Sequence, residues 1–555
     1  MIKQKSIIKI LCVLFSMVLI ASCGRVSDKN QGAPSAPSGQ TEPKSIVTPN
    51  GEFPIVTEPI TLTFFCQQVP NIPDMATNDF TVMYQEKTGV MIEWDLAPLN
   101  ALQEKKNISL ASNLLPDVYI GSGINREDMM QYGPKGIFIP LNDLIDKYNP
   151  ELKKAMAQLP IAEKIMTAPD GNIYSYPYLQ EILQATCGNR SWINTTWLKE
   201  LGLDVPKTTD EYINVLRAFK TDVNKNGKQD EIPMILPSVR GSTGITFLMN
   251  SFLYFDGGNG IILDDDKIVS VSYNKPEWRD GLRFLNSLYN EGLLDKASFT
   301  VTGEQVRQLV ESEEAMILGV VTVSNPSDFA NLSGERHKNY DPLSPLKGPA
   351  GHQTSTWNPY TSTELGALII TSACKYPEVA ARWADWFYTW EGTLISREGP
   401  EDVGWQRPAP GTLSYTGLPA TWERITAYGE ASNFKWDGIY FFPQNQLIHP
   451  QQGSNTDIYA TNGQPARLYQ AAKNNMLPYV PNQVFPPLFM DLDVINDFAQ
   501  IRTDLMRFVD DHIVQFITGV LSLENDWDAY INTFKQLRLD EYITILQDTF
   551  DKSGF

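Results

Sequence analysis

The strongest secondary-structure signal of this 555-residue sequence begins at residue 60 with ITLTFFCQQVPNIPDMATNDFTVMYQEKTGVMIEWDL, which ends at residue 96. The alternating run Ile60–Cys66 predicts a strand, Asp79–Lys87 predicts a helix, and Val90–Leu96 predicts a second strand. Residues 101–120 continue the pattern with another helix and another strand. Strands that alternate with helices indicate a parallel sheet covered by helices, so we expect an α/β fold.

A second block of the same kind begins near Trp192. Thr208 and Glu211 have the spacing of a capping box ahead of a helix over 210–220. Another amphipathic helix is predicted over 276–290, where a proline occupies the first turn. The body after the N-terminal region has roughly 500 residues, which is more than a single core supports, so we expect at least two lobes.

The N-terminal region has the layout of an exported and anchored protein. Lysines precede a short apolar run over 10–20, which predicts a signal peptide over residues 1–22. Ala21-Ser22-Cys23 is similar to the bacterial lipobox, so we expect a lipid on the Cys23 thiol. The alternative is a plain secretory signal with an incidental cysteine. Residues 23–58 are rich in Gly, Pro, Ser and charged residues, and they predict a flexible tether.

Composition narrows the classes of function. Asp and Glu number 65 against 45 Lys and Arg, and no basic cluster is present, so nucleic acid is not an expected partner. Beyond the N-terminal region the cysteines are Cys66, Cys187 and Cys374. Their odd number and wide spacing exclude a disulfide framework. One bridge stays open, but three buried thiols are favoured, and four scattered histidines argue against a zinc site.

Five segments spread along the chain carry a family resemblance: YQEKTGV at 84–90, ASNLLPD at 111–117, WLKELGL at 197–203, DVNKNGKQDE at 222–231 and YNEGLL at 289–294. Together and in this order, they resemble the bacterial extracellular solute-binding proteins of family 1. The similarity is greatest to the lipoproteins of ABC importers in the alginate-binding and LipO-like branch.

The resemblance implies a type II periplasmic-binding-protein-like fold, with two lobes, a hinge and a ligand cleft between the lobes. By analogy, the chain crosses between lobes near 177–190, 359–365 and 408–414. The implied first lobe therefore comprises residues 59–180 with 361–412. The implied second lobe comprises residues 181–360 with 413–555.

The resemblance also implies a function without catalysis. We expect a monomer, held by its lipid on the extracellular face of the bacterial cytoplasmic membrane, that captures an oligosaccharide-like solute and delivers it to an ABC importer permease. A peptide or another small solute on the same fold is an alternative. A surface glycan hydrolase is a weaker alternative, for which Glu398, Glu401 and Asp402 form the most suggestive acidic group.

The loop at 222–231 is the sharpest local motif. Oxygen-bearing side chains at positions one, three, five and nine, with Gly at six, follow the EF-hand pattern for Ca²⁺. Pro233 stands where an EF-hand has its last glutamate, and in the alginate-binding relatives the residue after the aspartate takes that role. The expected ligands of a structural Ca²⁺ are Asp222, Asn224, Asn226, the Lys228 carbonyl, Asp230 and Glu231. The alternative is a polar turn without an ion.

Sugar receptors combine aromatic platforms with amides and charged groups, so candidate ligand contacts are sought among loop residues. Trp383, Trp386 and Trp390 lie at helical spacing and are assigned to the core. The candidates are the aromatic residues Trp192, Trp357, Trp405, Trp436 and Tyr440 and the polar residues Asn78, Asn125, Tyr176, Arg190 and Arg240. The two arginines would pair with a uronate, and the sequence does not separate neutral from uronate ligands.

Overall fold

The computed structural model describes residues 46–237, 244–312, 316–426, 431–436, 439, 443–446, 448–453 and 457–555. Residues 46–555 form one compact unit. The predicted signal peptide, Cys23, Arg240 and Tyr440 lie outside the described residues. The predicted tether extends too far, because Val47 bridges Val56 and Ile55 is fully buried. No helix in the described part of the chain is long and apolar enough to cross a bilayer.

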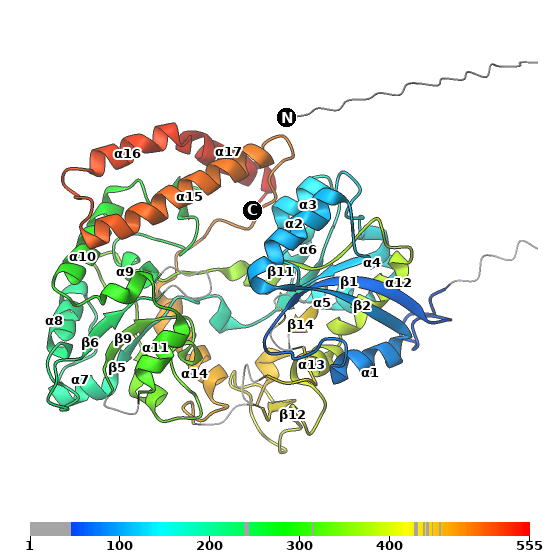
Figure 1. Cartoon of the computed structure of the whole chain (residues 1–555), viewed down its shortest axis with the longest axis horizontal. Coiled ribbons are helices and arrows are strands. Elements are labelled where there is room, and N and C mark those ends of the chain that lie inside the picture. Colours follow the sequence, from blue (N-terminus) through cyan, green and yellow to red (C-terminus); the bar gives the residue numbers. More distant parts are fainter. Residues whose placement is uncertain are drawn as a thin grey trace, which may run out of the picture. The chain divides into compact units, whose positions relative to one another are not determined.

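A six-stranded sheet forms the centre of the first lobe (Figure 1). Strands β1 and β2 are parallel, as are β1 and β3, which confirms the predicted βαβ pattern. Strand β11 runs antiparallel to both β3 and β4. The strand order is β14 (Gln444–Gln446), β4 (Tyr176–Gln180), β11 (Thr363–Ile370), β3 (Val118–Ile120), β1 (Ile60–Gln68) and β2 (Val90–Pro98).

Helices cover this sheet, and an aromatic core lies beneath them. Trp383 is fully buried and lies 4.9 Å from Phe64 of β1, ring centroid to ring centroid. Trp386 is 6% exposed, so the core assignment of these two tryptophans is confirmed, whereas Trp390 is only partly buried. The helices of this lobe are α1 (Asp79–Thr88), α2 (Leu102–Ser112), α3 (Arg126–Tyr132), α4 (Asn142–Tyr148), α5 (Pro150–Ala157), α6 (Ile161–Met166), α12 (Pro377–Asp385) and α13 (Trp390–Glu398).

A four-stranded sheet forms the centre of the second lobe, in the order β10 (Tyr340–Pro342), β5 (Ser191–Asn194), β9 (Leu318–Thr322) and β6 (Ile232–Ile235). The predicted capping box is present, because Thr208 accepts from the Glu211 backbone and Glu211 accepts from the Thr208 backbone. Strands β7 (Ile261–Leu263) and β8 (Val269–Val271) form a separate antiparallel hairpin, and β8 contacts a C-terminal helix, α17 (Leu539–Ser553). The helices of this lobe are α7 (Thr195–Leu201), α8 (Thr209–Phe219), α9 (Thr246–Met249), α10 (Pro276–Asn290) and α11 (Gly303–Val310).

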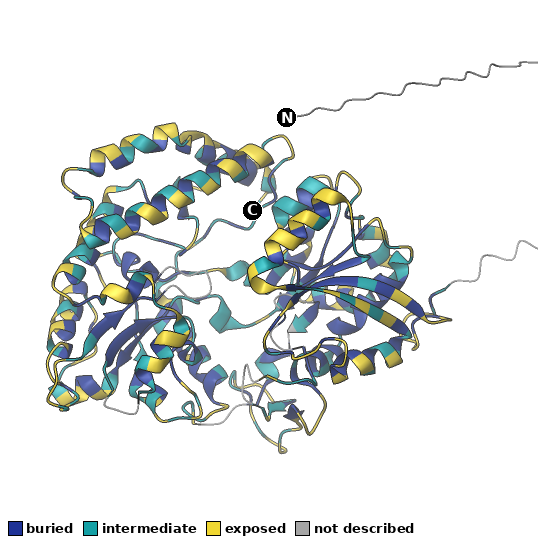
Figure 2. Ribbon diagram, in the orientation of Figure 1, coloured by how far each residue is buried: buried dark blue, intermediate teal, exposed yellow. Residues whose placement is uncertain are grey.

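Four further helices follow near the C-terminus: α14 (Gln464–Gln470), α15 (Ile495–Thr518), α16 (Trp527–Gln536) and α17 (Leu539–Ser553). Helix α15 packs on α10 of the second lobe and also contacts α3 of the first. These helices are buried on one side and exposed on the other, whereas the inner strands of both sheets are buried and the edge strand β2 is partly exposed (Figure 2). The long helix α15 therefore links elements of both lobes.

The last crossing between lobes differs from the prediction at 408–414. Strand β14 still pairs with β4 in the first sheet, and Trp436 packs on Phe80 of α1. A small pair of strands, β12 (Trp405–Gln406) and β13 (Glu423–Arg424), precedes them. Ser414 bridges Gly453 and Trp422 bridges Gln452, so the chain leaves the first lobe only after residue 453, and the stretch before it does not belong to the second lobe. No apolar strand signal marks this irregular segment, which is why the sequence missed it.

The three cysteines of the body are free thiols. Cys66 and Cys187 are buried, and Cys374 is half-buried. Burial raises the pKa of the Cys66 thiol to about 12, which keeps it protonated and unreactive.

Candidate functional site

Most of the predicted ligand aromatics are core residues. Trp192 and Trp436 are fully buried, and their indole nitrogens donate to the Val323 carbonyl at 3.0 Å and to Thr81 Oγ1 at 2.9 Å. Trp405 is 3% exposed and packs in a small separate core with Leu394, Trp422 and Ile448. Since their rings are enclosed by protein, these three tryptophans cannot contact a ligand in this conformation. For this conformation, the prediction that these three tryptophans contact the ligand is wrong.

Three of the predicted polar contacts have structural partners instead. Asn78 and Asn125 are the N-caps of α1 and α3, where each side chain accepts a backbone N–H of the first turn. Tyr176 is fully buried, and its hydroxyl donates to Asn149 Oδ1 at 2.9 Å. Helix capping and core burial therefore account for these side chains.

Arg190, predicted to bind a uronate, is engaged by the protein itself. It is 2% exposed, and its guanidinium donates to the carbonyls of Ser324, at 2.8 Å, and of Gln184. Burial lowers its pKa to about 10. Trp357 remains as a half-buried candidate, and its carbonyl accepts from the Tyr254 hydroxyl at 3.3 Å.

The predicted acidic group of a hydrolase is not assembled. Glu398 is 1% exposed and accepts from Arg424 Nε at 2.8 Å and from Arg424 Nη2 at 2.5 Å. Burial alone would raise the pKa of Glu398, but the Arg424 guanidinium lowers it. Glu401 is paired separately with Arg407 at 2.9 Å. A carboxylate held ionised in a buried pair is a poor general acid, so this group has a structural role.

The loop at 222–231 folds around its own oxygen atoms. Asp222 Oδ1 accepts from the Asn226 backbone at 3.0 Å, and Asp222 Oδ2 accepts from the Gly227 backbone at 3.1 Å. Asn226 Oδ1 accepts from the Lys228 backbone at 2.7 Å. The turn requires positive φ angles, 58° at Lys225 and 74° at Gly227. The loop thus turns the side chains of its first and fifth positions inward.

At the end of this loop, one carboxylate oxygen of Glu231 has no hydrogen-bond partner in the protein. Glu231 Oε1 accepts from the Asn224 backbone at 3.3 Å, whereas Glu231 Oε2 is buried with no hydrogen-bond partner in the protein. Asn226 Nδ2 lies 3.2 Å from both Asp230 oxygens. Because amide oxygen and nitrogen exchange places on a 180° rotation, the same side chains can present oxygen. This donor set fits a hard cation.

Carboxylates are not the only groups that could bind a cation in the loop at 222–231. Across the described ranges, no three His, Cys, Asp or Glu side chains gather as a metal-binding group. In the loop, the amides of Asn224 and Asn226 lie against Asp230, so amides separate the acidic side chains. An ion here would depend on amide and carbonyl oxygens as much as on carboxylates.

A second group of polar side chains contains buried atoms without partners in the protein. Arg126 Nε and Nη2 and the hydroxyls of Tyr273 and Tyr542 are all of this kind. Tyr273 is 1% exposed and Tyr542 is fully buried. Asp256 acts electrostatically on both tyrosines, and Glu364 acts on Arg126. We call these five residues, Arg126, Asp256, Tyr273, Glu364 and Tyr542, the polar cluster.

Elements of both lobes supply the polar cluster. Arg126 begins α3 and Glu364 lies in β11, both in the first lobe. Asp256 precedes the β7–β8 hairpin, Tyr273 follows it, and Tyr542 lies in α17. The charges of Arg502 in α15 and Glu127 in α3 also affect the pKa of Tyr542. Glu127 affects the pKa of Arg126 as well, so the residues of the two lobes share this neighbour. Helix α15 contacts both α3 and α17, so the helices that carry Arg126 and Tyr542 lie beside the same helix.

Burial shapes the electrostatics of the cluster. It raises the pKa of Glu364 to about 7, against the opposing effect of Arg126. It also raises the pKa of Asp256, although the Gly258 and Gly260 backbones donate to this carboxylate at 2.9 Å. Buried polar atoms without partners are costly and uncommon, and charged side chains with shifted pKa values gather at functional sites. The cluster is therefore the candidate ligand site.

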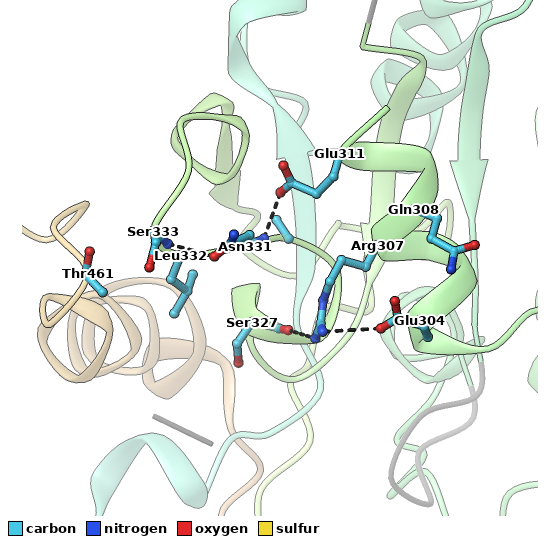
Figure 3. Close-up of a pocket in the computed structure, with 10 residues that line it drawn as sticks. Glu304, Arg307, Gln308, Glu311, Ser327, Asn331, Leu332, Ser333 and Thr461 are labelled. Carbon is cyan, nitrogen blue, oxygen red and sulfur yellow. Dashed lines mark hydrogen bonds and ion pairs between the residues drawn. The ribbon is translucent and has the colours of Figure 1, made fainter. Parts of the chain in front are cut away.

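A pocket of about 380 Å³ on the second lobe has a different character (Figure 3). Arg307 in its wall donates to Glu304 Oε2 at 3.3 Å and to the Ser327 carbonyl at 2.5 Å. Glu311 Oε1 accepts from the Asn331 backbone at 2.7 Å. Several of its polar groups pair with one another, although Arg307 Nε is buried without a partner in the protein, and no predicted ligand residue lines it. It is a weaker candidate than the polar cluster.

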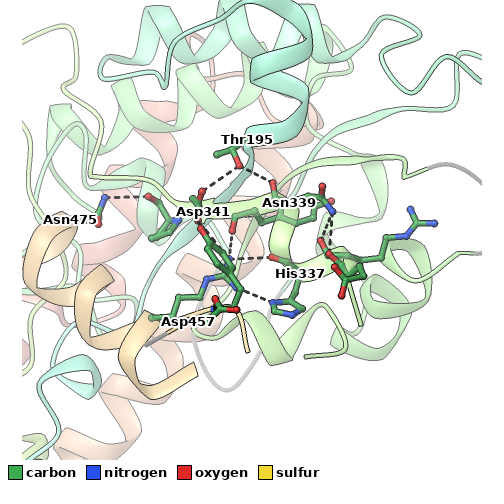
Figure 4. A network of polar contacts seen from close by, with 12 residues as sticks. Thr195, His337, Asn339, Asp341, Asp457 and Asn475 are labelled. Atoms are coloured by element: carbon green, nitrogen blue, oxygen red, sulfur yellow. Dashed lines mark hydrogen bonds and ion pairs between the residues drawn. The ribbon is translucent and has the colours of Figure 1, made fainter. Parts of the chain in front are cut away.

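A polar network attaches the segment that carries Tyr459 and Arg467 to the second sheet (Figure 4). This segment follows the last crossing of the chain between the lobes. Asp341 of β10 accepts from the Tyr459 hydroxyl at 2.6 Å and from Thr195 Oγ1 at 3.4 Å. Arg467 of α14 donates to the carbonyl of His337 at 3.2 Å. Burial and the Arg467 charge lower the pKa of His337 to about 4, so this histidine is neutral at physiological pH. The network is structural.

Comparisons with known proteins agree with this architecture. The sequence model of the bacterial extracellular solute-binding protein family matches residues 69–393. The fructooligosaccharide ABC transporter substrate-binding protein FusA of Streptococcus pneumoniae is 27% identical over 563 residues, which cover 97% of this chain and 96% of FusA. A structure of a FusA EF-hand mutant in complex with fructo-nystose covers 89% of this chain and 99% of that chain, with a TM-score of 0.74.

Two more distant structures share the fold. A solute-binding protein of Bifidobacterium longum infantis, described as HMO-binding and ABC-transporter-associated, is 20% identical with a TM-score of 0.73. The alginate-binding protein AlgQ2, solved without calcium ion, is 22% identical with a TM-score of 0.67. Each covers 89% of this chain and 99% of its own. The type II solute-binding fold expected from the sequence is confirmed.

Proposed function

The chain belongs to the bacterial extracellular solute-binding protein family, and on that premise we propose that it captures an oligosaccharide and delivers it to the permease of an ABC importer. The observation that carries this proposal is the similarity to a fructooligosaccharide-binding protein along 97% of the chain. The protein binds its ligand without chemical change. The pairing of Glu398 with Arg424 supports this view, because it engages the acidic residue that a hydrolase would need.

The ligand binds at the polar cluster. Its hydroxyl, guanidinium and carboxylate groups come from both lobes, so a ligand held there contacts both at once. Such contacts stabilise one arrangement of the lobes over another, which is how a hinged binding protein signals occupancy to a membrane partner. Sugar hydroxyls would supply the partners that Tyr273, Tyr542 and Arg126 lack in the protein.

The loop at 222–231 binds a structural Ca²⁺. The described FusA structure carries an EF-hand mutation, which supports an ion-binding loop in that relative. In this chain, Asp222, Asn224, Asn226, Asp230 and Glu231 with the Lys228 carbonyl would hold the ion, and the orphaned Glu231 Oε2 supports the assignment. Bound Ca²⁺ would neutralise the acidic loop and fix the segment between α8 and β6.

The protein acts as a monomer on the extracellular face of the cytoplasmic membrane, anchored through an acylated Cys23. A lipoprotein of Bacillus subtilis, LipO, is 26% identical over 284 residues, and this supports the anchored form. The anchor and the residues up to 45 then place the compact unit near a membrane permease.

A binding assay tests the function directly. Full-length protein carrying Cys23→Ala, which prevents acylation, is incubated with neutral oligosaccharides, oligouronates and peptides, and both Tm and reaction products are measured. We expect one oligosaccharide class to raise Tm, with a stabilisation of about 2.7 kcal/mol at a hundred times its Kd, and no products. Release of shorter sugars, or a response to peptides alone, would overturn the proposal.

A further inference from the structure

Residues 46–57, the last part of the predicted tether, fold back on themselves. Val47 forms an antiparallel bridge with Val56, and the Thr48 N–H donates to the Ile55 carbonyl at 3.0 Å. Ile55 is fully buried, and Val47 and Val56 are 9% and 5% exposed. This short segment therefore buries apolar side chains against the body of the protein. We call residues 46–57 the clasp.

A tight turn closes the clasp. The Glu52 N–H donates to the Pro49 carbonyl at 3.1 Å, and Gly51 has a φ of 88°. Glycine adopts this angle without strain, and a glycine with positive φ at the third position is typical of a type II turn. A carbonyl oxygen has two lone pairs, so the Pro49 carbonyl can accept a second hydrogen bond from outside the clasp.

A buried arginine of the first lobe donates to this turn. Arg382 of α12 is 4% exposed, and its Nη2 donates to the Pro49 carbonyl at 2.9 Å and to the Glu52 carbonyl at 3.1 Å. The dark blue start of the described chain lies beside α12 (Figure 1). A buried guanidinium that loses its acceptors is costly, so these two hydrogen bonds hold the turn on α12.

Two further helices of the same lobe hold the clasp. The Ile55 N–H donates at 2.9 Å to the carbonyl of Thr88, the last residue of α1. Asn50 Nδ2 donates at 3.0 Å to the carbonyl of Lys147 in α4. The clasp is thus attached to α1, α4 and α12, both at its turn and along its second half.

We infer that the clasp fastens the anchor chain to the first lobe and limits how far the compact unit can move from the membrane. The inference rests on the proposed anchor at Cys23. A chain spans at most about 3.3 to 3.6 Å per residue, so residues 23–45 reach at most about 80 Å, and release of the clasp adds about 40 Å. A pull on the anchor acts on the clasp before it acts on β1. The first lobe is therefore the one that the anchor holds, and hinge motion displaces the second lobe relative to it.

Hydrogen exchange tests the clasp in full-length protein carrying Cys23→Ala, which needs neither lipid nor ligand. We expect the Thr48 and Ile55 amides to exchange at least about a hundredfold more slowly than those of an unstructured chain. Arg382→Met should speed their exchange by about tenfold, because two hydrogen bonds from a charged donor are lost. Arg217→Met, which changes an exposed arginine of α8, is the matched control and should leave this exchange unchanged.

A second variant opens the clasp from its other side. Ile55→Asp places a carboxylate at a fully buried position of the clasp, so residues 46–57 should exchange quickly. Peptides from β1 should stay protected in this variant and in Arg382→Met, which shows that the first lobe is folded. Fast exchange of residues 46–57 without either substitution would overturn the inference.

The reach is measured with lipidated protein on vesicles, by energy transfer between a labelled lipid and a dye on Asp146→Cys, an exposed position of α4. Cys374→Ser removes the half-buried thiol from this protein. Transfer should fall in Ile55→Asp and equally when twelve Gly and Ser residues are inserted after Ser45. Unchanged transfer in Ile55→Asp would overturn the inference and leave the proposed function standing. Failure of the unsubstituted chain to bind vesicles would overturn the anchor itself.

Discussion

Arg502 of α15 and Glu127 of α3 form an ion pair with 2.5 Å between Arg502 Nη1 and Glu127 Oε1. Because α15 also packs on α10, this pair connects the two lobes beside the polar cluster. The side chains are 31% and 25% exposed, and partly exposed pairs contribute about 1 kcal/mol or less to stability. We therefore expect the pair to affect the arrangement of the lobes more than the stability of the fold.

Arg502→Met should weaken oligosaccharide binding by about threefold to tenfold and change Tm by less than about 2 °C. The physical reason is that the arrangement holding Tyr542 near Arg126 becomes less populated. Calorimetric titration measures the first effect and thermal unfolding the second. Glu127→Gln should have a similar effect, and the double variant should be no worse than either single one. Fully additive losses would show that the two residues act independently.

Removal of calcium should destabilise the second lobe. Chelation by EDTA should lower Tm of the wild-type protein, because an ion present at a hundred times its Kd stabilises the folded state by about 2.7 kcal/mol. Asp230→Asn should reduce this response. Asp266→Asn, on the exposed turn between β7 and β8, is the control and should respond like the wild type. An unchanged Tm on chelation would contradict the calcium assignment.

Substitutions of Trp436 and Trp357 should distinguish a core tryptophan from a candidate ligand contact. Trp436→Ala should lower the free energy of unfolding by about 3 to 5 kcal/mol, because it opens a cavity beside Phe80 and Trp383. Trp357→Ala, at a half-buried position, should change that free energy by less than about 1 kcal/mol and weaken oligosaccharide binding. Denaturant unfolding and calorimetric titration measure these effects. A Trp357 variant with wild-type affinity would remove Trp357 as a ligand contact.

Sequence patterns predicted the architecture better than the ligand residues. The alternation at Ile60–Cys66 and the cap at Thr208 depend on local chemistry, so they were correct. Trp192 and Trp436 follow no regular pattern because their burial depends on segments distant in sequence, such as Val323 and Thr81. No spacing rule predicts such contacts.

The polar cluster was missed for a related reason. Three of its members come from α3, β11 and α17 and two from loops that flank the β7–β8 hairpin, so they are far apart in the sequence. One signal was available, because Glu364 is the sole charge within the strand TELGALII at 363–370. A charge in an otherwise apolar buried strand costs free energy, so it marks a residue with a specific role. Asn125, which was predicted to contact the ligand, directly precedes Arg126 in the sequence.

The anchor assignment predicts the location of the protein in cells. Cys23→Ala should shift the protein from the membrane fraction to the soluble extracellular fraction, because the lipid attachment atom is lost. Immunoblotting of the separated fractions measures this shift. Ser22→Ala, which keeps a small residue before the cysteine, is the control and should stay with the membrane. Retention of the Cys23→Ala variant in the membrane fraction would argue against lipidation.

Glu364 should make stability depend on pH. Burial raises its pKa from an ordinary 4.5 to about 7, so the folded state binds this proton more tightly than the unfolded state does. The resulting stabilisation is fully present below pH 4.5 and is lost as the pH rises through 7. At about 1.4 kcal/mol per pH unit, the loss is on the order of 3 kcal/mol. Arg126, the charged group facing Glu364, reduces the shift without cancelling it.

Glu364→Gln removes this group, so the variant should lose less stability than the wild type between pH 5 and pH 8. Denaturant unfolding at both pH values measures the difference for each protein. Asp385, whose pKa burial raises to about 6, titrates in the same range but is present in both proteins, so its effect cancels in the comparison. Equal losses of stability in the two proteins would show that Glu364 titrates with an ordinary pKa and is not enclosed beside Arg126.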